Sequence, residues 1–91
     1  MIYTNMTVKE LKVKFDRLGV PKSFYAINGH LSSDTHMLNQ VYAYWEYFYF
    51  DERGNTRNYR KFENEEDACE YFFEVLKNEM KYYHPSKKGG A

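Results

Sequence analysis

The sequence predicts an α+β fold, with an N-terminal helix, a three- to four-stranded antiparallel meander, and a C-terminal helix packed on the sheet. Three observations carry this prediction. A capping box precedes an amphipathic segment near the start of the chain. Residues 41–50 are apolar or aromatic at nine of ten positions and contain no Gly or Pro, as in a buried strand. An acid-rich cap precedes a second amphipathic segment near the end.

The first helix is predicted over residues 8–18. Thr7 and Glu10 have the spacing of a capping box, in which each side chain accepts a hydrogen bond from the other residue's backbone N–H. Apolar residues then recur at helical spacing. Gly19 suits the left-handed residue that follows a helix, and Pro21 prevents continuation. Start and stop signals therefore agree.

The strands follow, with less distinct boundaries. Residues 24–28 form a short strand candidate that ends at Gly29, and residues 36–39 begin a second strand after a polar loop. No Gly or Pro separates this strand from Trp45. Because an uninterrupted strand would be far longer than the usual ~5–6 residues, we expect a turn around residues 39–42.

Alternate residues from position 45 share a face of the long strand. One face carries Trp45, Tyr47 and Tyr49, and the other carries Glu46, Phe48 and Phe50. Aromatic residues on both faces indicate a central strand that is covered on one side by a helix and partly on the other side by a second element. Because hydroxyl groups make its tips polar, we expect the tyrosine face to meet solvent or a partner.

A hairpin and a helix complete the fold. Residues 51–55 form the turn, with Gly54 supplying a positive φ, and residues 59–62 complete a basic edge strand. Asn64, followed by three acidic residues, predicts a helix start. Its predicted buried arc comprises Ala68, Cys69, Phe72, Phe73, Val75, Leu76 and Met80. We expect one domain over residues 1–84, a helix end near residue 83, and a flexible tail over residues 85–91.

Composition excludes several classes of protein. The single cysteine, Cys69, precludes an internal disulfide and a cysteine-rich zinc site. No signal peptide or membrane span is recognisable, so we expect a cytoplasmic protein without a membrane partner. The formal net charge of zero removes the general attraction to nucleic acid. The acidic residues are nevertheless concentrated between positions 63 and 74.

No residue pattern indicates catalysis. His30, Asp34 and His36 could contribute to a metal site, but the spacing matches no strict zinc pattern and is typical of an ordinary loop. Cys69 lies among apolar helix positions, where a cysteine usually serves packing. We therefore expect no enzyme, no metal and no cofactor.

A nucleic-acid-binding module is the main alternative, and a regulatory adaptor is a third class. Aromatic residues on a sheet beside Arg53, Arg57, Arg60 and Lys61 are similar to platforms that stack bases. The aromatic strand itself has no basic residue, and its flanks are acidic. Nucleic acid is therefore the less favoured partner.

Three segments of the chain resemble a known family. The runs WEYFYFDERG at 45–54, RKF at 60–62 and NEEDACEYFF at 64–73 are similar to small bacterial immunity proteins of polymorphic and contact-dependent growth-inhibition toxin systems. Shorter similarity occurs in LGVPK at 18–22 and YAING at 25–29. The chain departs from this pattern in having VYAY at 41–44, where a glycine-containing turn is expected.

The resemblance implies a protein that binds and neutralises a cognate toxin domain, commonly a nuclease with a basic surface. We expect it to be a monomer or weak dimer when free. Carboxylates can occupy a site that is built for phosphate, and opposite charges speed association. On this hypothesis the partner-binding residues are Tyr47, Tyr49, Asp51, Glu52, Tyr59, Glu66, Asp67, Glu70 and Glu74.

Overall fold

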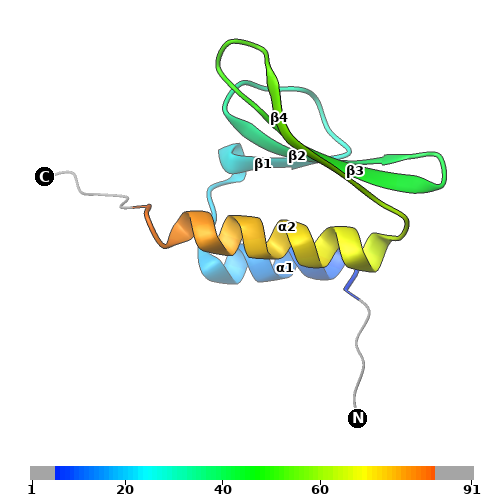
Figure 1. The fold of residues 1–91 in the computed structure, drawn as a ribbon. Coiled ribbons are helices and arrows are strands. Elements are labelled where there is room, and N and C mark those ends of the chain that lie inside the picture. Colours follow the sequence, from blue (N-terminus) through cyan, green and yellow to red (C-terminus); the bar gives the residue numbers. More distant parts are fainter. Residues whose placement is uncertain (1–5, 84–91) are drawn as a thin grey trace, which may run out of the picture.

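The computed structural model describes residues 6–83, which form two α-helices, one 3₁₀ turn and four strands. In chain order these are α1 (Val8–Leu18), η1 (Lys22–Phe24), β1 (Tyr25–Ile27), β2 (Thr35–Val41), β3 (Tyr44–Phe50), β4 (Thr56–Phe62) and α2 (Glu65–Met80). Both helices lie side by side against one face of the sheet (Figure 1). The α+β class and the order of helix, sheet and helix are as predicted.

Both ends of α1 and the start of α2 follow the predicted local signals, whereas α2 ends at Met80, before the predicted end near residue 83. Thr7 Oγ1 accepts from the Glu10 N–H, and Glu10 Oε1 accepts from the Thr7 N–H, both at 3.3 Å. Gly19 ends α1 with a φ of 76°, which an L side chain would strain. At the start of α2, the Asn64 side chain accepts from the Asp67 N–H at 2.8 Å. These caps satisfy backbone groups that the helices leave without partners.

The sheet has the order β1-β2-β3-β4, with β4 at an edge as predicted. Strands β2, β3 and β4 are antiparallel neighbours, but β1 pairs in parallel with β2. The predicted antiparallel meander is therefore confirmed in its three-stranded form, β2-β3-β4, and β1 adds a fourth, parallel strand at the edge. Residues 28–34 connect β1 to β2 over the side of the sheet opposite the helices (Figure 1). The predicted strand 24–28 is also shorter, because Phe24 belongs to η1.

The turn between β2 and β3 lies later than predicted. β2 continues to Val41, so that residues 42 and 43 alone make the turn, and Val41 pairs directly with Tyr44. Tyr42 adopts a φ of 55° and is 94% exposed. Left-handed backbone costs a non-glycine residue roughly 1–2 kcal/mol, so two-residue hairpin turns usually contain glycine. Because neither residue of this turn is glycine, the sequence does not indicate its position.

A β-bulge in β4 rearranges the edge of the sheet. Arg57 pairs with Tyr49 and Arg60 pairs with Tyr47, so that two residues of β4 oppose one residue of β3. Asn58, within the bulge, has a φ of 58°. As a result, the two arginines lie opposite residues of the helix-covered face. The β3–β4 turn itself spans residues 51–55 as predicted, and Gly54 has a φ of 84°.

The core lies between the sheet and the two helices. α2 contributes the predicted arc, of which Ala68, Cys69, Phe72 and Leu76 have no exposed surface. Phe72 makes edge-on ring contacts with Phe15 of α1 and with Tyr47 of β3. The buried cluster is completed by Leu11, Val20, Leu38 and Trp45. Burial of this apolar area is the main term that stabilises the fold.

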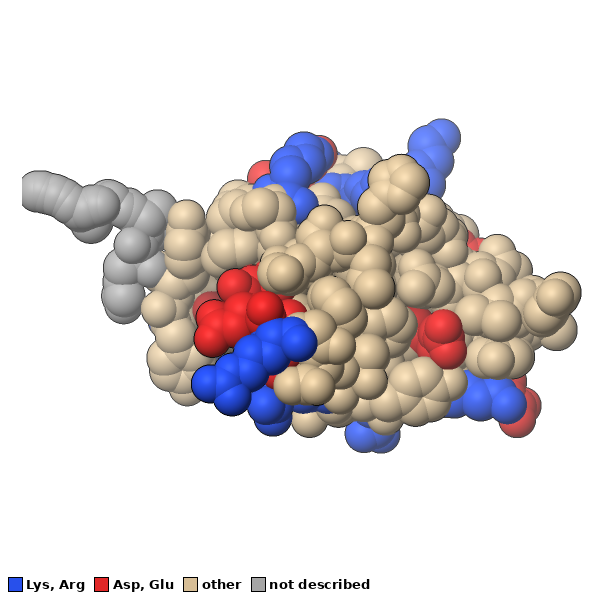
Figure 2. Space-filling model, turned by 90° about the horizontal axis from the view of Figure 1, so that it is seen from above, with Lys and Arg blue, Asp and Glu red and all other residues tan. Residues whose placement is uncertain are grey.

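The assignment of the faces of β3 is a correction. Trp45 and Tyr47, predicted to meet solvent or a partner, point toward the helices and are 6% and 2% exposed. The opposite face, called the open face below, carries Glu46, Phe48 and Phe50 and has no helix over it (Figure 1). Seen from that side, most of the surface is uncharged (Figure 2). Neither described helix is long and apolar enough to cross a bilayer.

Candidate partner-binding surface

The nine predicted binding residues occupy three separate parts of the structure. Tyr47 and Tyr49 belong to the helix side of β3, Asp51 and Glu52 to the β3–β4 turn, and Tyr59 to the open side of β4. The remaining four, Glu66, Asp67, Glu70 and Glu74, lie on α2. The sheet separates Tyr59 from the α2 carboxylates. These residues therefore do not form one continuous surface.

Tyr47 cannot act as a surface anchor in this conformation. Its ring lies against Tyr71 and Phe72 of α2, with centroid separations of 5.2 and 5.7 Å. Its hydroxyl is 2.9 Å from Nδ1 of His36. Burial raises the pKa of Tyr47 strongly, since the phenolate would lose its water. The polar tip that suggested exposure is satisfied internally.

Both carboxylate oxygens of Asp51 accept hydrogen bonds from residues of the β3–β4 hairpin. Oδ1 accepts from the backbone N–H groups of Arg53 and Asn55 at 2.9 and 2.8 Å, and Oδ2 accepts from Arg57 Nε at 2.8 Å. The residue is only 8% exposed. The Arg57 hydrogen bond and those from the turn lower the pKa of Asp51 to about 2. Asp51 therefore organises the turn, while Glu52 beside it is exposed.

Tyr59 lies on the open side of the edge strand and is 54% exposed. Its hydroxyl donates to Glu46 Oε1 of β3 at 3.0 Å. On the same side, Lys61 Nζ lies 4.4 Å from the ring centroid of Tyr44. These contacts pre-order two tyrosine rings and a lysine on an accessible part of the sheet, so less side-chain entropy would be lost on binding.

The acidic side of α2, by which we mean Glu66, Asp67, Glu70 and Glu74, faces away from the sheet. The helix carries six acidic residues and one lysine, whereas α1 carries four basic residues and two acidic ones. Asp67, Glu70 and Glu74 are exposed, and none of the three forms an ion pair with any residue between 6 and 83. Their negative charge is therefore available to a cationic partner.

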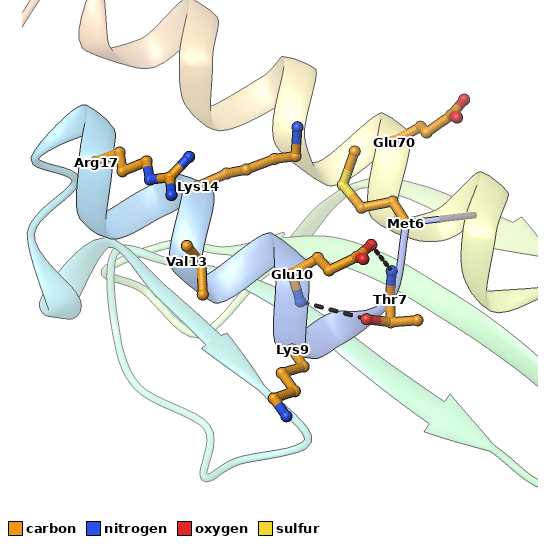
Figure 3. Close-up of a pocket in the computed structure, with 8 residues that line it drawn as sticks. All are labelled: Met6, Thr7, Lys9, Glu10, Val13, Lys14, Arg17 and Glu70. Atoms are coloured by element: carbon orange, nitrogen blue, oxygen red, sulfur yellow. Dashed lines mark hydrogen bonds between the residues drawn. The ribbon is translucent and has the colours of Figure 1, made fainter. Parts of the chain in front are cut away.

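A shallow hollow of about 540 Å³ runs along α1 beside this acidic side. Lys9, Lys14 and Arg17 of α1 contribute basic groups, and Glu70 is the α2 residue at its border (Figure 3). The exposed Val13 forms part of its floor, at 45% exposure. The helix layer thus presents a basic strip and an acidic strip next to each other.

Tyr49 belongs to a second, smaller cavity of about 210 Å³, which its ring lines together with Phe24, Asp34, His36 and Glu79. Tyr49 donates to Asp34 Oδ1 at 3.2 Å. Glu79 Oε1 lies 3.5 Å from His36 Nε2. This cavity lies where the C-terminal end of α2 approaches the sheet. Sequence reasoning missed Phe24 and Glu79, because no local pattern brings positions 24, 34, 36, 49 and 79 together.

The structure also describes the surroundings of the two candidates for chemistry, the Cys69 thiol and the possible metal site at His30, Asp34 and His36. Cys69 is fully buried, and burial raises the pKa of its thiol to about 12, so it is a packing residue and a poor nucleophile. Among residues 6–83, no group of three or more His, Cys, Asp or Glu side chains is arranged to hold a metal ion. The spacing of His30, Asp34 and His36 thus does not correspond to a ligand cluster.

Comparison with known proteins found no relative of this chain. No protein-family model matches the sequence, no curated protein matches it, and no solved structure matches the fold.

Proposed function

We propose that this chain is an immunity protein that binds a toxin domain through the acidic side of α2 and neutralises it in the cytoplasm of the producing cell. The observation that carries the proposal is the set of three exposed carboxylates, Asp67, Glu70 and Glu74, without ion-pair partners among the described residues. The resemblance of residues 45–54, 60–62 and 64–73 to immunity proteins supports the same function.

The chemistry of a nuclease fits this surface. An enzyme that acts on a phosphodiester must present cationic groups to phosphate, and carboxylates can occupy the same groups. Charges that face solvent contribute mainly to the rate of association and less to the final affinity. An inhibitor that must capture a toxin before damage occurs benefits most from this kind of complementarity.

The position of the carboxylates on a packed helix also favours binding. Ala68, Cys69, Phe72 and Leu76 hold α2 against the core, so that the backbone beneath Glu70 and Glu74 is rigid. A rigid array loses less conformational entropy on association than charges on a loop. Tyr47 has no part in this contact because it is buried, and Asp51 is committed to its turn.

The decisive experiment is a binding measurement with the polypeptide encoded immediately upstream. The purified protein is titrated calorimetrically with that polypeptide at two salt concentrations, and association rates are measured for E70K/E74K. We expect tight stoichiometric binding to the unaltered protein, weakening with salt. In the variant, association slows by about tenfold or more and depends less on salt, because steering is lost.

The control variant is Lys12→Glu, which changes an exposed residue of α1. If the acidic side of α2 makes the contact, K12E associates at nearly the original rate. If K12E instead sped association by an amount comparable to the slowing in E70K/E74K, the response would be to total charge, which would contradict the assigned surface. Absence of binding to the unaltered protein would contradict the immunity function.

The open face of the sheet favours single-stranded nucleic acid as the second candidate. Tyr44 and Tyr59 lie on that face with Lys61, the one basic residue of β4 that pairs with a residue of the open face. Exposed rings beside cations can stack bases. Fluorescence anisotropy with a labelled oligonucleotide distinguishes this candidate: salt-sensitive binding that is lost in Y44A/Y59A would favour it over the toxin.

A further inference from the structure

The small cavity at the C-terminal end of α2 combines negative charge with aromatic walls. Phe24 and Tyr49 supply the rings, while Asp34, His36 and Glu79 supply polar atoms, around a volume of about 210 Å³. The Phe24 ring is itself held by an edge-on contact with Tyr83, at 5.0 Å between centroids. The walls therefore come from η1, β2, β3, α2 and the loop before β2, with the Phe24 ring held by packing and the Asp34 and Glu79 carboxylates exposed.

The two carboxylates of this cavity have only neutral hydrogen-bond donors within it. Asp34 accepts from the Tyr49 hydroxyl at 3.2 Å, and Glu79 faces His36 Nε2 at 3.5 Å. No lysine or arginine is among the lining residues. Neither carboxylate forms an ion pair with a lysine or arginine anywhere in residues 6–83. The cavity therefore holds negative charge that the described part of the chain does not neutralise.

His36 does not supply the missing positive charge at neutral pH. Its side chain is 12% exposed, and this burial lowers its pKa although Glu79 acts in the opposite direction. In the neutral ring, Nε2–H points to Glu79, so Nδ1 is the acceptor for the Tyr47 hydroxyl at 2.9 Å. Both ring nitrogens are thus satisfied without a second proton.

Aromatic faces next to unneutralised carboxylates are suited to one class of group. A guanidinium ion is planar, donates hydrogen bonds in a fork that matches carboxylates, and stacks on aromatic rings. It is also less strongly hydrated than an ammonium ion, so it loses less on entering a half-enclosed site. A cavity of this size is too small for a cofactor, since ligand pockets usually span roughly 300–1,000 Å³.

We propose that this cavity is a receptor for the guanidinium group of an arginine on the bound partner, with Asp34 and Glu79 as acceptors and Phe24 and Tyr49 as the stacking walls. The affinity for guanidinium follows from the cavity alone. The identification of its source as the toxin rests on the proposed function. The cavity would then be a second point of contact, at the opposite end of α2 from Asp67.

The first test uses methylguanidinium, which needs no partner protein. The isotopically labelled protein is titrated with methylguanidinium chloride, with sodium chloride at equal ionic strength as the reference, while NMR signals of the Tyr49 and His36 rings are followed. We expect saturable shifts with a dissociation constant of about 1–10 mM, the range for so small an ion. The pH midpoint of His36 falls on binding, because a nearby cation opposes its protonation.

The variants D34N and E79Q keep the shape of the acceptors and remove their charge. Each should weaken methylguanidinium binding about tenfold, the loss of one charge-assisted hydrogen bond. The matched control is Glu63→Gln, an exposed carboxylate outside the cavity, which should leave the dissociation constant unchanged. Shifts that sodium chloride reproduces, or equal weakening by E63Q, would overturn the proposal.

The second test uses the polypeptide encoded upstream. If its arginine enters the cavity, D34N/E79Q weakens the complex at least tenfold while E63Q does not. Unaltered affinity of D34N/E79Q for the toxin, despite loss of methylguanidinium binding, would overturn the assignment of the arginine to the toxin. Failure of the unaltered protein to bind the toxin would contradict the proposed function, and the methylguanidinium result would still decide whether the cavity binds guanidinium.

Discussion

The two faces of β3 carry nearly the same kinds of residue but have different roles. On the helix-covered face, Tyr47 is 2% exposed and its hydroxyl reaches His36 Nδ1 at 2.9 Å. On the open face, Glu46 accepts from Tyr59, which is 54% exposed. A tyrosine hydroxyl therefore does not indicate a solvent-exposed face when a polar partner for it lies in the core. Burial is decided by that partner and by the neighbouring helix.

The largest difference between the two faces is expected when a side chain of each is truncated to alanine and the free energy of unfolding is measured. Tyr47→Ala removes a ring that packs on α2 and leaves a cavity, at a cost of about 3–5 kcal/mol in the free energy of unfolding. Phe50→Ala on the half-buried open face should cost about 1–2 kcal/mol, since less area leaves water there. Urea denaturation of both variants measures the difference. Equal losses would show that the open face is covered as fully as the helix face.

Removing only the hydroxyl of a tyrosine should give a smaller difference in stability between the two faces. Tyr47→Phe leaves Nδ1 of the half-buried His36 without its partner and should cost about 1–2 kcal/mol. Tyr59→Phe removes an exposed hydrogen bond to Glu46, and water can replace it, so we expect less than about 0.5 kcal/mol. Thermal unfolding under identical conditions compares the two. A larger effect for Y59F would reverse the roles that the structure gives to these residues.

The smallest expected effect is the pH dependence of stability that His36, on the helix-covered face, contributes. Because burial lowers the pKa of His36 below its ordinary value of 6.5, the unfolded chain binds a proton before the folded chain does as the pH falls. Stability should therefore decline as pH falls from about 7 toward the lowered pKa of the folded state. His36→Gln should flatten this part of the profile, measured between about pH 7.5 and 5.5. A slope that is unchanged in H36Q would show that another group causes it.

Much of the fold could be predicted because its signals are local. The capping box at Thr7 and Glu10, the positive φ at Gly19, and the cap at Asn64 each depend on residues within one helical turn. The buried arc of α2 was also correct, since its periodicity specifies one apolar side. The bulge at Asn58 and the left-handed Tyr42 were missed, because neither position carries a glycine.

The candidate binding residues could be predicted only in part. The exposure of Glu70 and Glu74 follows from their place opposite the apolar arc of α2. The commitment of Asp51 to its own turn depends on Arg57, beyond the turn. The cavity between His36 and Glu79 depends on the final helix reaching the beginning of β2.

Local signals in the chain specify both ends of α1, the start of α2, the hairpin turn at residues 51–55, the edge position of β4 and the separation of acidic from basic segments. The parallel pairing of β1, the buried face of β3, and the carboxylates that have no lysine or arginine partner among residues 6–83 all depend on the packing of distant segments. The physical reason is the range of the interactions. Caps and turns are settled between neighbours in the chain, whereas the choice of a face and the pairing of charges depend on which distant residues the packed helices bring into contact.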